Sequence, residues 1–249
     1  MERNKTPDWV SRLTIILLGA VALSFLLSYF VDSPILPPPT QILLAFRKLW
    51  RKKIYLHLGM SLWRVFAGLL LGVALGSLLG ILMGRSSKWN QWLDPIVYLI
   101  YPIPKMALLP VALLFLGIGE ASKIALLMII VLPQVTVSVR DGILQTPQEL
   151  YQVYKGLNAS RWHTFWNITF KAILPSIFSM IRISLGTSFS VLFFMENYGT
   201  RLGMGFYIMD AWMRMDYASM YAAILLVSGV GLLLFILTDW ISRLVTPWQ

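Results

Sequence analysis

The sequence contains no cysteine and only two histidines, His57 and His163. The absence of cysteine excludes disulfide bonds, thiolate metal sites and cysteine nucleophiles. No group of His, Asp and Glu has the spacing of metal ligands, which argues against a catalytic metal. The sequence also lacks the pattern G-x-x-x-x-G-K-[ST], so this chain has no P-loop for nucleotide phosphates.

Charged residues are scarce as well. They make up 13% of the 249 residues, whereas 57% are hydrophobic and the mean hydropathy is +0.71. The polar residues are too few to cover the surface of a soluble protein of this size, so we predict an integral membrane protein. Its length suits about six helical spans of roughly 20 residues each and leaves no room for a separate soluble enzymatic domain.

Acidic residues are fewer than basic ones: the sequence has 11 Asp and Glu but 21 Lys and Arg, for a net charge of +10. Nucleic-acid binding is one explanation for such a charge. In a chain with several spans, however, Lys and Arg more often lie in cytoplasmic loops and at lipid headgroups. We therefore expect a lipid membrane, and no nucleic acid, as the partner of this charge.

Apolar runs indicate where the spans lie. The first, residues 13–31, is longer than a signal-peptide core and lacks a small-residue cleavage site, so we expect it to be retained. After a proline-rich break, residues 41–59 form a basic amphipathic stretch that predicts an interfacial helix. The other expected spans are residues 61–84, 96–116, 123–139, 172–195 and 219–237.

Two of these spans have unusual composition. The third is interrupted by Pro102, Pro104 and Pro110, and such a broken helix usually lines a cavity or gate. The second carries five glycines spaced four apart, which fall on one helical face and predict close packing against another helix. They are Gly68, Gly72, Gly76, Gly80 and Gly84.

Six spans with the basic N-terminus inside place the loop at Arg85, the polar block that begins at Gly142 and the C-terminus in the cytoplasm. One basic cluster conflicts with this orientation, because the orientation places it outside the cytoplasm. We keep the orientation because the charges of the other loops favour it. The cluster consists of Arg47, Lys48, Arg51, Lys52 and Lys53.

The polar block between the fourth and fifth spans reads TPQELYQVYKGLNASRWHTFWNITFKAILPS. It resembles the cytoplasmic coupling loop of binding-protein-dependent ABC importer permeases, in particular the family that moves nitrate, taurine and alkanesulfonates. The resemblance extends over residues 36–248. The segments HLGMSLWRVFAGLLLGVALGSLLGILMG, LDPIVYLIYPIPKMALLPVALLFLGIGEASKI and MIRISLGTSFSVLFFMENYGTRLGMG follow in the family's order.

This resemblance implies an all-α polytopic membrane protein with about six transmembrane helices and the type I ABC importer permease (MetI-like) fold. Residues 1–35 would be the N-terminal tail and first transmembrane helix, and residues 36–249 the permease core, with a coupling loop at about residues 142–171. The implied function is that of a transporter subunit in the bacterial inner membrane, not of an enzyme, with both termini cytoplasmic. The implied partners are a second permease copy, two ATPase subunits that bind ATP and Mg, and an extracytoplasmic solute-binding protein. No cofactor is implied in this chain.

The family's coupling loop carries a Glu-Ala-Ala motif and a later Gly, which form two short helices and a turn that docks into a cleft of the ATPase. Here the motif aligns with Gln152, Val153 and Tyr154, and its Gly with Asn158, so the motif is degenerate. Asn suits the turn because it tolerates left-handed backbone. Glu149, about one turn earlier, is a candidate for the role of the missing Glu. The expected coupling residues are Glu149, Gln152, Val153, Tyr154, Gly156, Asn158, Ala159 and Ser160. The alternative is an ordinary cytoplasmic helical hairpin.

Four residues are candidates for the translocation path or its gate. Glu196 ends the fifth span shortly before Gly203, and a carboxylate at a membrane boundary is costly unless it is paired or wet. The alternative for Glu196 is a salt bridge, with Arg201 as a partner. Pro104 breaks the third span, and Lys105 beside it could attract an anion or snorkel to an interface.

The solute stays open at this point. Basic residues near the expected path, with the resemblance, favour a small anion such as a sulfonate, nitrate or bicarbonate, but related permeases also move pyrimidine-type vitamin precursors. Arg64 and Arg182 match family positions, and we expect structural pairing or snorkelling for both.

Two rival functions remain. A membrane-embedded enzyme or scaffold would use Glu196, Asp210 and Asp216 for lipid-headgroup chemistry, yet the sequence has no nucleophile motif. A channel is a third possibility, but no filter motif or ring-forming charge is visible.

Overall fold

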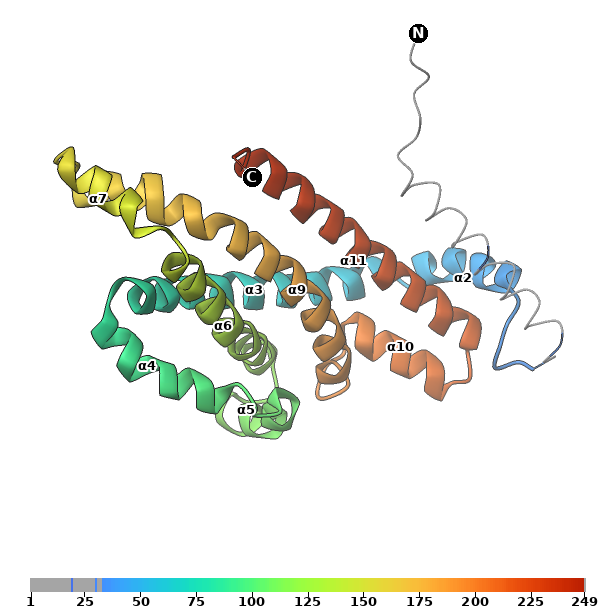
Figure 1. The fold of residues 1–249 in the computed structure, drawn as a ribbon. Helices are drawn as coiled ribbons and strands as arrows, with labels where there is room; N and C mark the ends of the chain where they lie inside the picture. Colours follow the sequence, from blue (N-terminus) through green and yellow to red (C-terminus); the bar gives the residue numbers. More distant parts are fainter. Residues whose placement is uncertain (1–18, 20–29, 31–32, 249) are drawn as a thin grey trace, which may run out of the picture.

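The computed structural model describes residue 19, residue 30 and residues 33–248. This part of the chain consists of helices joined by short loops and contains no strand (Figure 1). The elements are α2 (Pro39–Arg51), α3 (Ile54–Arg85), α4 (Ser87–Ile100), the 3₁₀ helix η1 (Lys105–Leu108), α5 (Leu109–Leu116), α6 (Glu120–Leu144), α7 (Gln148–Gly156), α8 (Arg161–Thr164), the π-helix η2 (Phe165–Phe170), α9 (Lys171–Met195), α10 (Met204–Met213) and α11 (Tyr217–Val245).

Within the described residues, four helical segments are long and apolar enough to cross a membrane: α3, α6, Arg161–Met195 and α11. A fifth candidate is the pair of α4 and Lys105–Leu116, bent by 88° near Pro102 and Pro104, where the third span was predicted to break. The predicted first span, residues 13–31, lies outside the described residues apart from residues 19 and 30. The other five predicted spans all have a counterpart, and the all-α polytopic fold is confirmed.

The helix boundaries differ from the prediction in two places. The basic stretch expected to form one interfacial helix over residues 41–59 is divided, because Lys53 adopts left-handed backbone with φ 55° and separates α2 from α3. The second span therefore begins at Ile54 rather than at residue 61. Helix α6 continues to Leu144, so Gly142 belongs to a spanning helix and not to the polar block.

The glycine stripe of α3 packs directly against α6, as predicted. A Cβ atom built on Gly68 would lie 2.5 Å from the Cβ of Leu127. On Gly76 it would lie 2.7 Å from the carbonyl oxygen of Leu132 and 2.9 Å from the Cβ of Val135. Because real Cβ atoms do not approach other atoms so closely, only glycine permits this separation of the two backbones.

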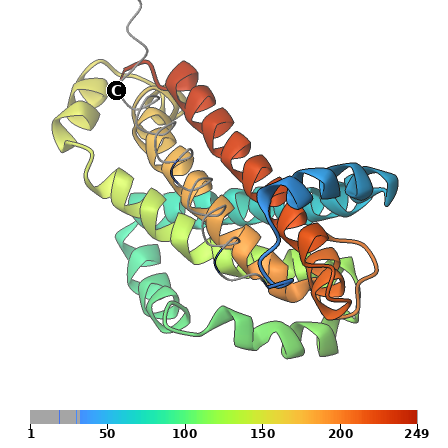
Figure 2. The same cartoon turned by 90° about the vertical axis from the view of Figure 1, so that its right-hand side faces the viewer.

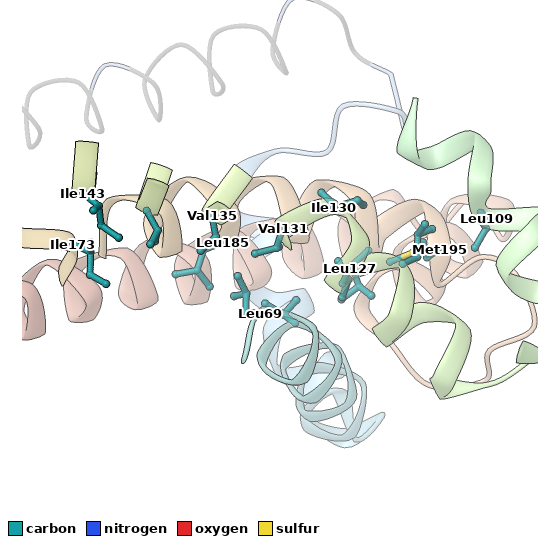
Figure 3. Packing of buried hydrophobic residues seen from close by; sticks show 14 residues of the cluster. Leu69, Leu109, Leu127, Ile130, Val131, Val135, Ile143, Ile173, Leu185 and Met195 are labelled. Carbon is teal, nitrogen blue, oxygen red and sulfur yellow. The ribbon is translucent and has the colours of Figure 1, made fainter. Parts of the chain in front are cut away.

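The main core lies where α6 passes between α3 and α9. Val131 and Val135 of α6 are fully buried, and Figure 3 shows Val135 beside Leu185 and Ile143 beside Ile173 of α9. The row of α6 residues that packs against the α3 glycines, here called the glycine seam, thus also contacts α9, which makes α6 the central helix of the described structure. By contrast, α4 has no buried residue and extends along the outside.

A second core forms where α2 and α10 pack against the first turns of α11 (Figure 2). Ala45 and Leu49 of α2 are buried there with Ala222. Asp216 closes this junction from the side: its carboxylate accepts from Ser219 N at 3.3 Å as the N-cap of α11, and from Lys48 Nζ at 2.6 Å. Burial alone would raise the pKa of Asp216, but the hydrogen bonds from Lys48 and Ser219 outweigh it and hold this pKa below its ordinary value.

We predict that Gly76→Ala lowers the free energy of unfolding by about 1–3 kcal/mol, because the new methyl group overlaps a backbone carbonyl that cannot move aside. Gly229→Ala in α11 is the matched control, since a Cβ there meets nothing within 4 Å. The control should unfold at the same temperature as the wild type or slightly higher. Thermal unfolding of the purified full chain in detergent measures both variants. Equal midpoints would contradict the close packing of α3 against α6 at Gly76.

The lowered pKa of Asp216 predicts that the stability of the fold depends on pH. A carboxylate whose pKa is lower in the folded state stabilises the fold above its unfolded pKa, and this contribution is lost as the pH falls through the folded pKa. The difference in unfolding temperature between wild type and Asp216→Asn should therefore be constant above about pH 5 and shrink below pH 3.8, the ordinary pKa of this group. A difference that does not change with pH would show that the carboxylate charge is unimportant.

Candidate functional site

The polar block forms a compact element beyond the packed helices. This α7–α8 element consists of α7, the turn after it and α8. Figure 1 shows α7 at the far end of α9, away from the junction of α2 and α10. The chain turns back after α7 into the single turn of α8, passes through the six-residue π-helix η2, and continues into α9. The two short helices and the turn expected from the resemblance are therefore present.

The turn between α7 and α8 depends on Asn158. Its φ of 53° places it in the left-handed region, as predicted for the residue that occupies the family's Gly position. Asn158 N donates to Lys155 O at 3.1 Å, and Ala159 N donates to Tyr154 O at 3.0 Å. This pair of bonds closes the helix end as a Schellman motif. Gly156, another of the expected coupling residues, is the last residue of α7 and has no positive φ.

Three side-chain contacts hold the element together and connect it to the rest of the protein. The hydroxyl groups of Tyr151 and Thr169 lie 3.2 Å apart, and the ring of Tyr154 stacks on His163 at 5.9 Å between centroids. The guanidinium of Arg85, at the end of α3, lies 5.7 Å from the ring centroid of Phe165. The side chain of Ser160 caps α8 by accepting from His163 N. A displacement of the element would therefore be transmitted to α3 and α9.

The exposed surface of this element is apolar at its centre. Leu150, Val153 and Leu157 are spaced so that they share one side of α7 and its end, and Leu157 is 73% exposed. Trp162 in α8 is 70% exposed. Of these four, sequence reasoning had selected only Val153, although large apolar residues in an otherwise polar loop were a usable signal.

At the other end of the spans, Arg64 joins two carboxylates. Its Nε and Nη2 donate to Glu120 at 2.6 Å each, and its Nη1 donates to Glu196 Oε1 at 2.6 Å. Ser61 Oγ donates to the same Glu196 oxygen at 2.7 Å, and Gly205 N donates to Oε2 at 2.7 Å. The partner of Glu196 is therefore Arg64 and not Arg201.

Burial makes this cluster a structural junction. Arg64 and Glu196 are each 1% exposed, whereas the side chain of Glu120 is 42% exposed. The cluster connects α3, the start of α6, the end of α9 and the start of α10. Gly203 completes it, because a Cβ there would lie 2.4 Å from Glu196 Cδ. Two of the four path candidates, Glu196 and Gly203, thus lie in contact.

The other two path candidates lie elsewhere. Pro104 ends the bend between α4 and η1, and Lys105 Nζ donates to Tyr101 O at 2.5 Å and lies 5.2 Å from the Tyr101 ring centroid. In the described part of the chain, no hydrogen bond or ion pair connects Lys105 to Glu196. The structure therefore divides the path candidates between two places.

Two cavities lie beside α9 and α11. One, of about 320 Å³, is bordered by Ser61 and Glu196 and otherwise by mostly apolar residues such as Phe189 and Phe235. The other, of about 430 Å³, is lined by Arg182, Asp239, Ser242, Arg243, Thr246 and Pro247.

The second cavity contains an ion pair of Arg182, for which the sequence favoured pairing or snorkelling without indicating the partner. Arg182 Nη2 lies 2.5 Å from Asp239 Oδ1, and both side chains are a little over two-fifths exposed. A charged pair on apolar helices is costly against lipid, so this face borders water or protein.

The comparisons with known proteins decide the family. The family model described as "Binding-protein-dependent transport system inner membrane component" matches residues 68–247. The chain belongs to this family. It is the membrane-spanning permease subunit of an ABC importer in the inner membrane, and not an enzyme.

Similar proteins support the assignment along most of the chain. The taurine transport system permease protein TauC of Escherichia coli (strain K12) is 31% identical over 220 residues, which cover 86% of this chain and 80% of that protein. The nitrate import permease protein NrtB of Synechocystis sp. is 34% identical over 187 residues, covering 75% and 68%. A solved structure of the MetNI methionine ABC transporter, in an inward-facing conformation, shares the fold with a TM-score of 0.66 at 21% identity, covering 76% of this permease and 94% of that chain.

We predict that Glu196→Gln lowers the free energy of unfolding of this permease by about 3 kcal/mol, because it removes one partner of a buried ion pair. Glu120→Gln is the matched control: it makes the same change against the same arginine, but at a carboxylate that water reaches. The control should have a clearly smaller effect, measured by denaturant unfolding in detergent. If the two variants lose equal stability, the buried pair is not the stronger link.

Proposed function

We propose that two copies of this permease form the membrane channel of an ABC importer, with two ATPase subunits docked on the α7–α8 element and an extracytoplasmic protein that delivers the solute. The projecting element with its exposed apolar surface is the observation that carries the proposal. Such a surface on a water-facing loop is typical of a protein interface. ATP and Mg would be bound by the partner subunits, since this chain has no P-loop.

The docking surface would consist of Leu150, Val153, Leu157 and Trp162, with Glu149 and Gln152 beside them. The family's motif Glu is absent at Gln152, so an acidic residue would not hold the centre of the interface. Lys155 and Arg161 flank the apolar residues. We infer that the ATPase cleft complementary to this surface is apolar in the middle and acidic at its margin.

Coupling would begin when ATP closes the ATPase dimer and draws the two α7–α8 elements together. Tyr151, through Thr169 of η2, connects each element to the segment that continues into α9, and Arg85 connects that segment to α3 through Phe165. Because the glycine seam leaves no room between α3 and α6, these helices would rotate as one body. The permease would thereby alternate between outward-open and inward-open forms.

The path would follow α9. Glu196 and Gly203 would form part of its extracytoplasmic gate, where Glu196 borders the cavity of about 320 Å³. Arg182 and Asp239 would border its cytoplasmic portion, because a half-exposed ion pair requires water or protein beside it. Pro104 and Lys105, at the bend of the third span, would line the path on the side opposite α9.

We infer a small anion as the solute. Taurine and nitrate, named for the two relatives above, both carry an anionic group, and sulfonate, nitrate and bicarbonate ions share delocalised negative charge on oxygen. Arg182 and Arg243 line one cavity with only one carboxylate, Asp239. With the α7–α8 element in the cytoplasm, both termini would be cytoplasmic, residues 1–35 would add the first helix, and residues 36–249 would form the core.

Substitutions at Asn158 test whether docking of the ATPase depends on this turn. Asn158→Val places a β-branched residue at positive φ, which costs about 1–3 kcal/mol and should lower recovery of a P-loop ATPase with the tagged permease by roughly tenfold. Asn158→Gly keeps the turn and should retain the ATPase. The measurement is co-purification from native membranes in mild detergent, with bound ATPase quantified by mass spectrometry.

Equal recovery of the ATPase with Asn158→Val and Asn158→Gly would show that docking does not depend on this turn. Absence of any ATPase with the wild-type permease would overturn the assignment of the α7–α8 element. Unfolding temperatures of both variants would show whether the valine acts on the turn alone.

A further inference from the structure

The basic cluster at the end of α2 divides into two groups. Lys48 and Lys52 lie 2.6 and 3.8 Å from Asp216 Oδ2, so one carboxylate serves both lysines. Arg47 and Arg51 point elsewhere: among the described residues, no carboxylate lies within ion-pair distance of either guanidinium. Two permanently charged groups, one helical turn apart, therefore have no counter-ion within the described part of the chain.

These two arginines border an apolar groove of about 540 Å³ between α2, the start of α3 and α11. Its remaining lining is almost entirely hydrocarbon and aromatic: Phe46, Leu49, Trp50, Ile54 and Leu226. Of the described residues that line the groove, Arg47 and Arg51 are the charged ones. The groove thus combines an apolar floor with a cationic rim.

The position of the groove relative to the membrane follows from α11. Leu226 is nine residues after Tyr217, about 14 Å along an apolar helix that is long enough to span the bilayer. Leu226 in the floor therefore lies at the depth of acyl chains, while Lys48 and Lys52, on the same helix end as the arginines, reach Asp216 at the start of α11. Leu43, Leu44 and Trp50 of α2 are also exposed, as in a helix that lies in the membrane interface.

We propose that this groove binds an anionic phospholipid, with one acyl chain against Trp50 and Leu226 and the phosphate between Arg47 and Arg51. Guanidinium groups bind phosphate through charge-assisted hydrogen bonds, and two arginines that have no ion-pair partner among the described residues favour a lipid with net negative charge over a zwitterionic one. An acidic surface of a soluble protein would satisfy the rim but leave the apolar floor empty. The lipid satisfies both.

This site gives the anomalous basic cluster a function other than setting topology. Arg47, Lys48, Arg51, Lys52 and Lys53 conflict with the orientation that the remaining loops favour. Lys48 and Lys52 fasten α2 to Asp216, and Arg47 and Arg51 retain a lipid at the same junction. Neither role depends on the ATPase, the solute or the proposed gate.

The experiment uses the full chain in nanodiscs of phosphatidylcholine that contain a small fraction of brominated lipid, either brominated phosphatidylglycerol or brominated phosphatidylcholine. Bromine quenches tryptophan at short range, and the difference between wild type and Trp50→Phe isolates the signal of Trp50. The test variant is Arg47→Gln/Arg51→Gln. The control variant, Arg201→Gln/Arg214→Gln, removes the same charge from exposed positions outside the groove.

We expect Trp50 quenching by the brominated phosphatidylglycerol to exceed that by the brominated phosphatidylcholine at least about threefold in wild type and control, and the difference to vanish in the test variant. Equal quenching by the two lipids in the wild type would overturn the proposal. So would an unchanged preference in the test variant, or loss of the preference on adding inorganic phosphate, which would indicate a site for a free anion.

Discussion

The separation between the α3 and α6 backbones constrains the rest of this permease. At five successive turns of α3, a glycine faces a residue of α6 so closely that no side chain fits between them. The backbone of α3 lies directly against side chains and carbonyl groups of α6, and the two helices have little freedom to slide or roll. Helix α6 can then present Val135 and Ile143 to α9 at a fixed position, and α9 in turn carries the projecting α7–α8 element.

The two functional ends of the molecule are both anchored on this rigid pair. Arg64, at one end of α3, holds Glu120 at the start of α6 and Glu196 at the end of α9. Arg85, at the other end, contacts Phe165 beside the α7–α8 element. A single helix thus connects the ion-pair junction with the surface proposed to meet the ATPase. This arrangement suits a transporter in which a movement on one side of the membrane must change the opening on the other.

Features with local causes were predictable from the sequence. The glycine stripe follows from spacing along one helix, the bend in the third span from its prolines, and the left-handed turn at Asn158 from backbone preference. Features that depend on distant partners were not. Arg64 meets Glu196, 132 positions away, and Arg182 meets Asp239 on another helix, so no periodicity reveals them. The break at Lys53 also escaped, because lysine carries no turn signal and only tertiary packing selects its positive φ.

The π-helix η2 has a consequence for how the α7–α8 element is aimed. A π-turn contains one residue more than an α-turn, so the six residues of Phe165–Phe170 set the rotation of everything before them relative to α9. An extra residue in a continuous α-helix would turn the element by about 100° around the helix axis, whereas the π-turn takes up that residue within one full turn. The winding of η2 therefore keeps the proposed docking surface facing one direction relative to α9, separately from the side chains that would make the contact.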